Sequence, residues 1–218
     1  MEKVNKKFKW IFFDLDGTLA DSIPSLYKAH VNFLKMFGVV SNREEFEKLN
    51  GPSIPEIIIF LKNKYKLVND DNFLINLYEN ETLKAYRKYV KPFDGLNEIL
   101  SELKNRGYKL VLVTSASRDI SMEFINNYKL GKYFKDYIFG DEVKRAKPDQ
   151  EIYSKALKKV GAKQASTVVI EDAYNGVKSA KEAGIFVVAL SNNQSKDNLS
   201  TAGADIVVPS ISDILQIL

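Results

Sequence analysis

The sequence predicts an α/β fold, a Rossmann-like parallel sheet with a block of helices inserted after its first strand. Three observations predict it. From residue 95 onward, short apolar runs typical of buried strands alternate with helical patterns. The segment from about 22 to 88 has helical periodicity and almost no strand signal. An acidic motif directly follows the first apolar run, at the strand end where open α/β sheets bind ligands.

The first strand is predicted at residues 10–13, because Trp-Ile-Phe-Phe is a short run of aromatic and β-branched side chains. Four helices should follow, because capping or proline-containing sequences near residues 22, 42, 54 and 70 precede periodic or charged segments. We expect these helices to form a cap domain over residues 22–89. The core would then comprise residues 1–21 and 90–218.

The remaining chain alternates between strands and helices. Strands are predicted at 110–113, 137–139, 167–170, 186–190 and 205–208, and helices at about 95–106, 118–129, 150–160 and 174–183. Near-continuous apolar strands separated by helices indicate a parallel sheet covered on both faces. The polar segment 191–195 is interpreted as a surface loop.

Composition narrows the class of protein. The 218 residues are 45% hydrophobic, which is ample for a core, and cysteine is absent, so neither disulfides nor a thiol nucleophile is available. The net charge of +4 is spread along the chain without a basic stripe, so no nucleic-acid partner is expected. The sequence has no signal-like or membrane-spanning run. We expect a cytoplasmic monomer or weak dimer with no membrane partner.

Two carboxylates, Asp14 and Asp16, lie one residue apart directly after the first strand, in the motif Asp-Leu-Asp-Gly-Thr-Leu. Alternation along a strand would direct both into the crevice beyond the sheet. Two buried like charges stay ionised only beside a cation or strong donors. Oxygen ligands at a phosphate site favour Mg²⁺, so the motif predicts a magnesium site.

Three further strand ends carry polar groups. Thr114 and Ser115 follow the second core strand and offer donors for an anion. Lys147 lies before a predicted helix, where it could stabilise a phosphate and paired carboxylates, and Glu171-Asp172 end another buried strand. Taken singly, each has a structural explanation, such as helix capping. Four such motifs in order on four strand ends favour one shared active site.

These four motifs resemble the signature motifs of the haloacid dehalogenase (HAD) superfamily of hydrolases. The resemblance covers essentially the whole chain, including a helical cap after the first motif, as in the phosphoglycolate phosphatase and β-phosphoglucomutase branch. The segment 147–153 matches that branch's Lys-Pro-x-Pro-x-x-Tyr pattern except for Gln150, where proline is usual. That departure affects a helix start and leaves the lysine in place.

The resemblance implies a phosphatase that acts on a small phosphorylated metabolite through an aspartyl-phosphate, similar to phosphoglycolate phosphatase. Asp14 would be the nucleophile and Asp16 the general acid and base. Thr114, Ser115 and Lys147 would bind phosphate. Mg²⁺ would be held by Asp14, Asp16 (through its backbone carbonyl), Glu171 (directly or through water) and Asp172.

Other readings stay open at this point. A sugar-phosphate mutase shares every core motif, but it carries a histidine after the first motif and a basic cap residue for a second phosphate. Segments 23–27 and 51–54 supply neither here, so hydrolysis is favoured.

The second aspartate and the Glu-Asp pair argue against a dehalogenase, and no Schiff-base lysine of a phosphonatase can be located. A non-catalytic phospho-ligand-binding protein is the alternative from another class, disfavoured because every catalytic position is intact. His30 is interpreted as a packing or surface residue, and the tyrosines at 78, 86 and 89 are interpreted as filling the core and the cap interface.

Overall fold

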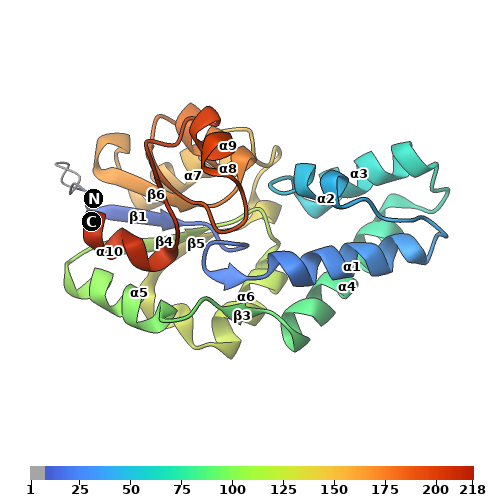
Figure 1. Cartoon of the computed structure of the whole chain (residues 1–218), viewed down its shortest axis with the longest axis horizontal. Helices are drawn as coiled ribbons and strands as arrows, with labels where there is room; N and C mark the ends of the chain where they lie inside the picture. Colours follow the sequence, from blue (N-terminus) through green and yellow to red (C-terminus); the bar gives the residue numbers. More distant parts are fainter. Residues whose placement is uncertain (1–7) are drawn as a thin grey trace.

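In this computed structural model, which describes residues 8–218, six parallel strands form the central sheet (Figure 1). The first seven residues of the predicted core lie outside the described range. The strands are β1 (Trp10–Phe13), β4 (Lys109–Val113), β5 (Phe134–Ile138), β6 (Thr167–Glu171), β7 (Phe186–Leu190) and β8 (Ile206–Val208). Their order is β5-β4-β1-β6-β7-β8, so β1 lies between β4 and β6 at the sheet centre.

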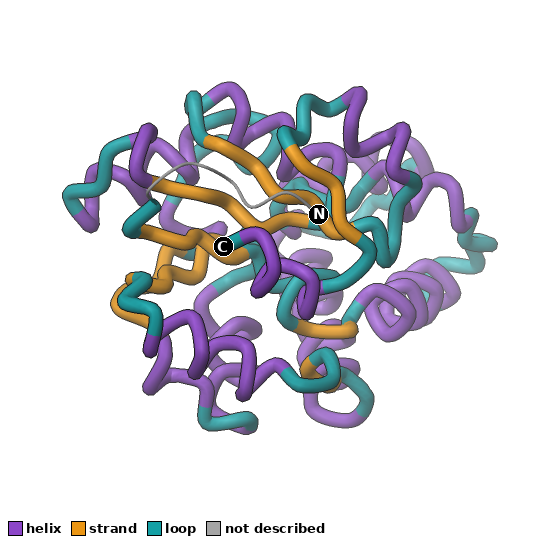
Figure 2. Tube along the Cα trace, turned by 60° about the vertical axis from the view of Figure 1, so that its left-hand side comes forward, coloured by secondary structure: helices purple, strands orange, loops and turns teal. Residues whose placement is uncertain are grey.

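Helices cover both faces of this sheet, as the sequence predicts (Figure 2). Alternation along β1 sends Ile11 and Phe13 to one face and Trp10 and Phe12 to the other. The first face packs on α5 (Leu96–Asn105), α6 (Arg118–Asn127) and α10 (Ile214–Ile217). The opposite face packs on α7 (Glu151–Val160), α8 (Tyr174–Glu182) and α9 (Lys196–Thr201).

Some elements differ from the sequence prediction. Strand β5 begins at Phe134 and not at residue 137, because it is an edge strand that tolerates the polar Lys135 and Asp136. The short helices α9 and α10 were not predicted. Four 3₁₀ turns were not predicted either: η1 (Leu130–Tyr133), η2 (Gly140–Glu142), η3 (Gln164–Ser166) and η4 (Ile211–Asp213).

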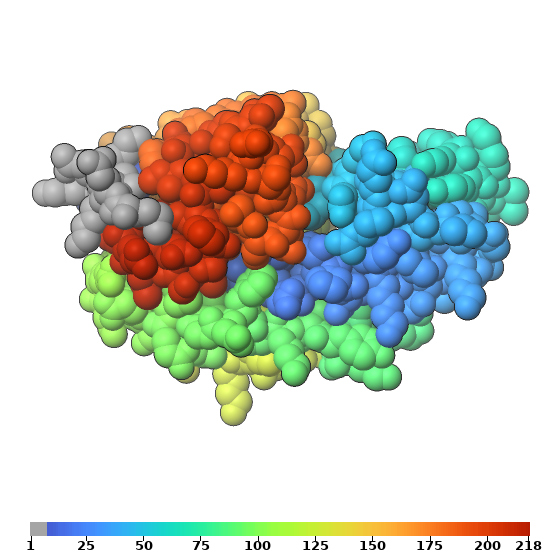
Figure 3. All heavy atoms as spheres, viewed as in Figure 1, coloured from blue at the N-terminus to red at the C-terminus, as the bar shows by residue number. Residues whose placement is uncertain are grey.

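The inserted segment consists of α1 (Ile23–Lys35), α2 (Arg43–Lys48), α3 (Ile54–Tyr65) and α4 (Asp71–Lys88), here called the cap. It has its own apolar cluster, which includes Phe33, Ile58 and Leu74. A short antiparallel pair, β2 (Ala20–Asp21) with β3 (Lys91–Pro92), joins the two ends of the insertion. In the space-filling view the cap, blue to teal, lies directly against the orange C-terminal part of the core (Figure 3). The exact domain boundaries stay a prediction.

A membrane-crossing helix would need a long apolar stretch, and no helix within residues 8–218 has one.

Candidate active site

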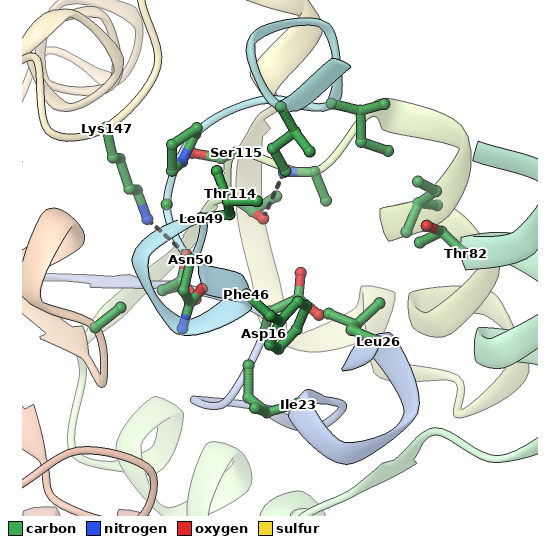
Figure 4. Close-up of a pocket in the computed structure, with 18 of the residues that line it drawn as sticks. Asp16, Ile23, Leu26, Phe46, Leu49, Asn50, Thr82, Thr114, Ser115 and Lys147 are labelled. Atoms are coloured by element: carbon green, nitrogen blue, oxygen red, sulfur yellow. Dashed lines mark hydrogen bonds and ion pairs between the residues drawn. The ribbon is translucent and has the colours of Figure 1, made fainter. Parts of the chain in front are cut away.

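A pocket of about 100 Å³ lies between the carboxyl ends of the strands and the cap (Figure 4). Six of the seven predicted site residues line it: Asp14, Asp16, Thr114, Ser115, Lys147 and Glu171. The seventh, Asp172, offers a carboxylate oxygen within 4.8 Å of those of Asp14 and Glu171. The structure therefore brings together the residues that four separate motifs supply. They meet because the carboxyl ends of parallel strands share one edge of the sheet.

Lys147 is the central cation of this cluster. Only 2% of its side chain is exposed, and its Nζ lies 2.6 Å from Asp14 Oδ1 and 2.7 Å from Glu171 Oε1. The ammonium also donates to the Val113 carbonyl at 3.4 Å. Burial alone would lower the pKa of Lys147, but the charges of Asp14 and Glu171 outweigh it and hold that pKa well above its usual range. Lys147 is therefore charged at neutral pH and joins two carboxylates from different strands.

Asp14 directly follows the central strand, where its N–H donates to the Ile170 carbonyl at 3.0 Å. Burial raises the pKa of Asp14 to about 8, the Lys147 ammonium opposes that increase, and the Glu171 charge adds to it. The carboxylate is thus held in a site that favours its neutral form unless more positive charge arrives.

Asp14, Glu171 and Asp172 each offer a carboxylate oxygen within 4.8 Å of the others, and all three are buried. Asp172 accepts hydrogen bonds from Thr18 Oγ1 and Asn193 Nδ2, both at 3.1 Å and both neutral donors. Burial and the neighbouring carboxylates hold its pKa well above the usual range. Lys147 supplies one positive charge for three carboxylates. The donor set and its excess negative charge fit a divalent cation that prefers oxygen ligands.

Both oxygens of Glu171 are already engaged within the protein. Its Oε1 accepts from Lys147 and, at 3.4 Å, from the Tyr153 hydroxyl. Its Oε2 accepts from the N–H groups of Asp172 at 2.8 Å and Ala173 at 2.9 Å. A Cβ on Gly176, in the first turn of α8, would lie 1.7 Å from Glu171 Oε1. Glycine is therefore required there for this carboxylate to sit in place.

Asp16 has a different environment. Strand β1 ends at Phe13, so strand alternation does not orient Asp16 as predicted. Its Oδ1 accepts a hydrogen bond from the hydroxyl of Tyr86, on cap helix α4. Burial raises the pKa of Asp16, while the neighbouring hydroxyls of Ser22 and Tyr86 lower it. Its carboxylate is not part of the three-carboxylate group, although it lines the same pocket. The two aspartates therefore have separate partners suited to separate roles.

Thr114 and Ser115 follow β4. The Thr114 hydroxyl oxygen accepts from the Ala116 N–H at 3.1 Å, so its own proton points away from that bond. The buried Ser115 hydroxyl has no hydrogen-bond partner among the described residues. A buried polar group without a partner costs free energy, which a bound ligand can recover. Both side chains line the pocket, beside the acidic cluster.

Sequence reasoning missed several contributors. Segment 191–195 is more than the surface loop that was predicted, because Asn193 contacts Asp172 and Asn192 Nδ2 donates to the Gly17 carbonyl at 2.7 Å. Tyr86 was interpreted only as packing, yet it contacts Asp16. None of these three contacts has a local signal, since each joins residues at least 21 positions apart.

The cap contacts the core through backbone as well as side chains. Glu56 Oε1, on α3, accepts from the Ala146 N–H at 3.2 Å, next to Lys147. Asn175 Nδ2, on α8, donates to the Asn50 carbonyl at 2.8 Å. These contacts hold the cap over the carboxylate cluster.

Comparison with known proteins agrees with this geometry. The family model for haloacid dehalogenase-like hydrolases matches residues 11–190. A phosphorylated carbohydrates phosphatase of Thermotoga maritima is 30% identical over 212 residues, covering 95% of this chain and 97% of the relative. A phosphoglycolate phosphatase of Pseudomonas syringae is 29% identical, covering 84% and 69%. A hydrolase structure from Pseudomonas syringae superposes with a TM-score of 0.83 at 25% identity, covering 96% and 97%.

Proposed function

Because the chain belongs to the haloacid dehalogenase-like hydrolase family, we propose that it is a Mg²⁺-dependent phosphatase of a small phosphorylated metabolite. The relatives named above are phosphatases of carbohydrate phosphates and of phosphoglycolate. The observation that carries the proposal is the Lys147 bridge between Asp14 and Glu171, buried at the end of the central strands. That arrangement offers a carboxylate nucleophile beside a fixed cation.

The proposed reaction has two steps. An Asp14 oxygen attacks phosphorus in line, and the bond from phosphorus to the leaving alcohol breaks as the aspartyl-phosphate forms. Asp16 gives its proton to the leaving oxygen and then takes one from the water that attacks the aspartyl-phosphate. That attack breaks the bond between phosphorus and Asp14, releases phosphate and restores the carboxylate. The raised pKa of Asp16 suits the first role, because it favours the protonated form that can give its proton to the leaving oxygen.

Asp14, Asp172 and the backbone carbonyl of Asp16 would hold Mg²⁺, which neutralises charge on the phosphoryl group when bound. The two engaged oxygens of Glu171 support an indirect role for that residue, through water or through Lys147. Thr114, Ser115 and Lys147 would donate to the phosphoryl oxygens that face away from Asp14.

A sugar-phosphate mutase would need a cation on the cap side of the pocket to bind a second phosphate. Among the described residues, Lys147 is the one cationic side chain that lines the pocket, and it belongs to the core. His30, on α1, is not among the lining residues. The geometry therefore favours hydrolysis.

The test is hydrolysis of p-nitrophenyl phosphate by the purified protein with Mg²⁺, with EDTA and after Mg²⁺ is restored. We expect activity only with the metal, and trapping of Asp14 by beryllium fluoride with Mg²⁺ in the wild type. The matched control for Asp14→Asn is Asp94→Asn, which changes a solvent-exposed carboxylate outside the cap and should stay active. Full activity in thoroughly chelated protein, or near-normal turnover by Asp14→Asn, would contradict the proposal.

A further inference from the structure

The cap side of the pocket is mainly apolar and carries no charge. Its cap lining includes six apolar side chains, Ile23, Leu26, Phe46, Leu49, Ile54 and Ile57. Lys147, the cation that lines the pocket, is already paired with two carboxylates. A second ionised group on the leaving alcohol would lose its hydration here without gaining a cationic partner among the described lining residues, which is strongly unfavourable.

Besides the amide of Asn50, two neutral hydroxyl groups interrupt this apolar lining. Tyr78 and Thr82 are four residues apart on α4, so they lie on the same face of that helix. Thr82 is 5% exposed, and its hydroxyl has no hydrogen-bond partner among the described residues, not even the preceding turn of its own helix. In the pocket view Thr82 lies well apart from Lys147 (Figure 4). The unpaired hydroxyl is therefore on the part of the wall remote from the phosphoryl-binding residues.

The Tyr78 hydroxyl is held by His30, whose Nδ1 lies 3.1 Å away. The His30 ring is fully buried against Phe46 and Tyr78. Burial lowers the pKa of His30 to about 4 and raises that of Tyr78, so both are neutral at pH 7. If Nδ1 accepts, the tyrosine oxygen can still accept a second bond; if Nδ1 donates, the tyrosine O–H can still donate. In either tautomer Tyr78 keeps one capacity for a ligand hydroxyl.

We propose that Thr82 and Tyr78 bind a hydroxyl of the leaving group, and that the substrate is a small phosphomonoester whose alcohol is hydroxylated and uncharged. This inference rests on the proposed phosphatase function and narrows its substrate class. Thr82 and Tyr78 would be specificity-determining residues, and His30 a positioning residue. A ligand hydroxyl would satisfy the unpaired Thr82 hydroxyl, whereas a carboxylate would have no cation on the cap side.

The test compares three phosphomonoesters of similar size: glycerol phosphate, propyl phosphate without hydroxyls, and phosphoglycolate with a carboxylate. In the wild type with Mg²⁺ we expect kcat/KM for glycerol phosphate to exceed that for propyl phosphate about tenfold, the worth of a good neutral hydrogen bond. It should exceed that for phosphoglycolate by a larger factor, on the order of a hundredfold, because an unpaired charge costs more.

Variants locate the effect. Thr82→Val and Tyr78→Phe should each lower the ratio of glycerol phosphate to propyl phosphate about five- to tenfold. Thr82→Ser should retain the ratio, as should the exposed controls Thr201→Val and Tyr89→Phe. Thr82→Val should also melt at the same or a higher temperature, because it removes an unpaired buried hydroxyl. A large fall in melting temperature would mean that Thr82 serves the fold instead.

A double-mutant cycle tests the positioning role of His30. His30→Phe should lower the same ratio in the wild type and leave it unchanged in Tyr78→Phe, because its effect acts through the tyrosine hydroxyl. An equal effect in both backgrounds would contradict that role.

Failure of the inference is distinguishable from failure of the proposed function. Magnesium-dependent hydrolysis of p-nitrophenyl phosphate with phosphoglycolate preferred, or with unaltered ratios in Thr82→Val and Tyr78→Phe, overturns the inference alone. No hydrolysis of any monoester overturns the proposed function and this inference with it.

Discussion

Replacing Asp14 with asparagine should stabilise the metal-free protein at neutral pH. Burial raises the pKa of Asp14 from 3.8 to about 8. Between pH 3.8 and about 8, Asp14 keeps its proton in the native state but has released it in the unfolded chain. The contribution of Asp14 to the free energy of unfolding is therefore fully present below pH 3.8 and is lost as the pH rises toward 8. The slope is about 1.4 kcal/mol per pH unit, and the accumulated loss reaches up to about 4 kcal/mol at pH 7. The asparagine side chain does not titrate in this pH range, so Asp14→Asn should not show this loss of stability.

The measurement is urea unfolding in EDTA at pH 5, 6, 7 and 8, followed through the fluorescence of Trp10, the single tryptophan of the chain. We expect the free energy of unfolding of the wild type to decrease with pH more steeply than that of Asp14→Asn. Magnesium should flatten the wild-type slope, because a bound cation favours the ionised carboxylate and stabilises the native state. Asp94→Asn, an exposed control, should follow the wild type.

Equal pH slopes for Asp14→Asn and the wild type would refute the reasoning. Such a result would mean that Asp14 is ionised in the native protein as readily as in the unfolded chain. Lys147 alone would then neutralise the site, and the argument from excess negative charge to a divalent cation would fail.

Two further substitutions test the surroundings of the catalytic groups. Tyr86→Phe removes a hydrogen bond that lowers the pKa of Asp16, so the limb of the pH–rate profile assigned to Asp16 should move to higher pH. The exposed control Tyr89→Phe should not move it, and an unshifted Tyr86→Phe profile would separate Tyr86 from catalysis. In an unobstructed helix position, replacing glycine with alanine stabilises a protein by about 1 kcal/mol through helix propensity. At Gly176 the added Cβ meets the Glu171 carboxylate, so we expect Gly176→Ala to lower the free energy of unfolding by about 1–2 kcal/mol and the activity at least tenfold. The control is Lys178→Ala, which changes an exposed residue on the same helix. A Gly176→Ala protein that is both active and stabilised would show that Glu171 can move without loss of activity or stability.

The sequence alone predicted the parallel sheet and most of the residues that the candidate site brings together. Apolar runs and helical periodicity are local properties, so the strands and the main helices could be identified without tertiary information. Parallel strands then bring their carboxyl ends together, and this brought Asp14, Lys147 and Glu171 into one site. Strand β5 was placed only in part, because an edge strand carries polar side chains that mask its pattern.

Only the tertiary structure decided how the cap completes the pocket. The contact of Tyr86 with Asp16 spans 70 positions, and that of His30 with Tyr78 spans 48. The first contact depends on how α4 packs on the core, and the second on how α1 and α4 pack on each other within the cap. No local periodicity encodes either arrangement. The Thr82 hydroxyl has no hydrogen-bond partner among the described residues, and this too was decided by the tertiary structure, because hydrogen bonding is a property of the folded surroundings and not of the residue type.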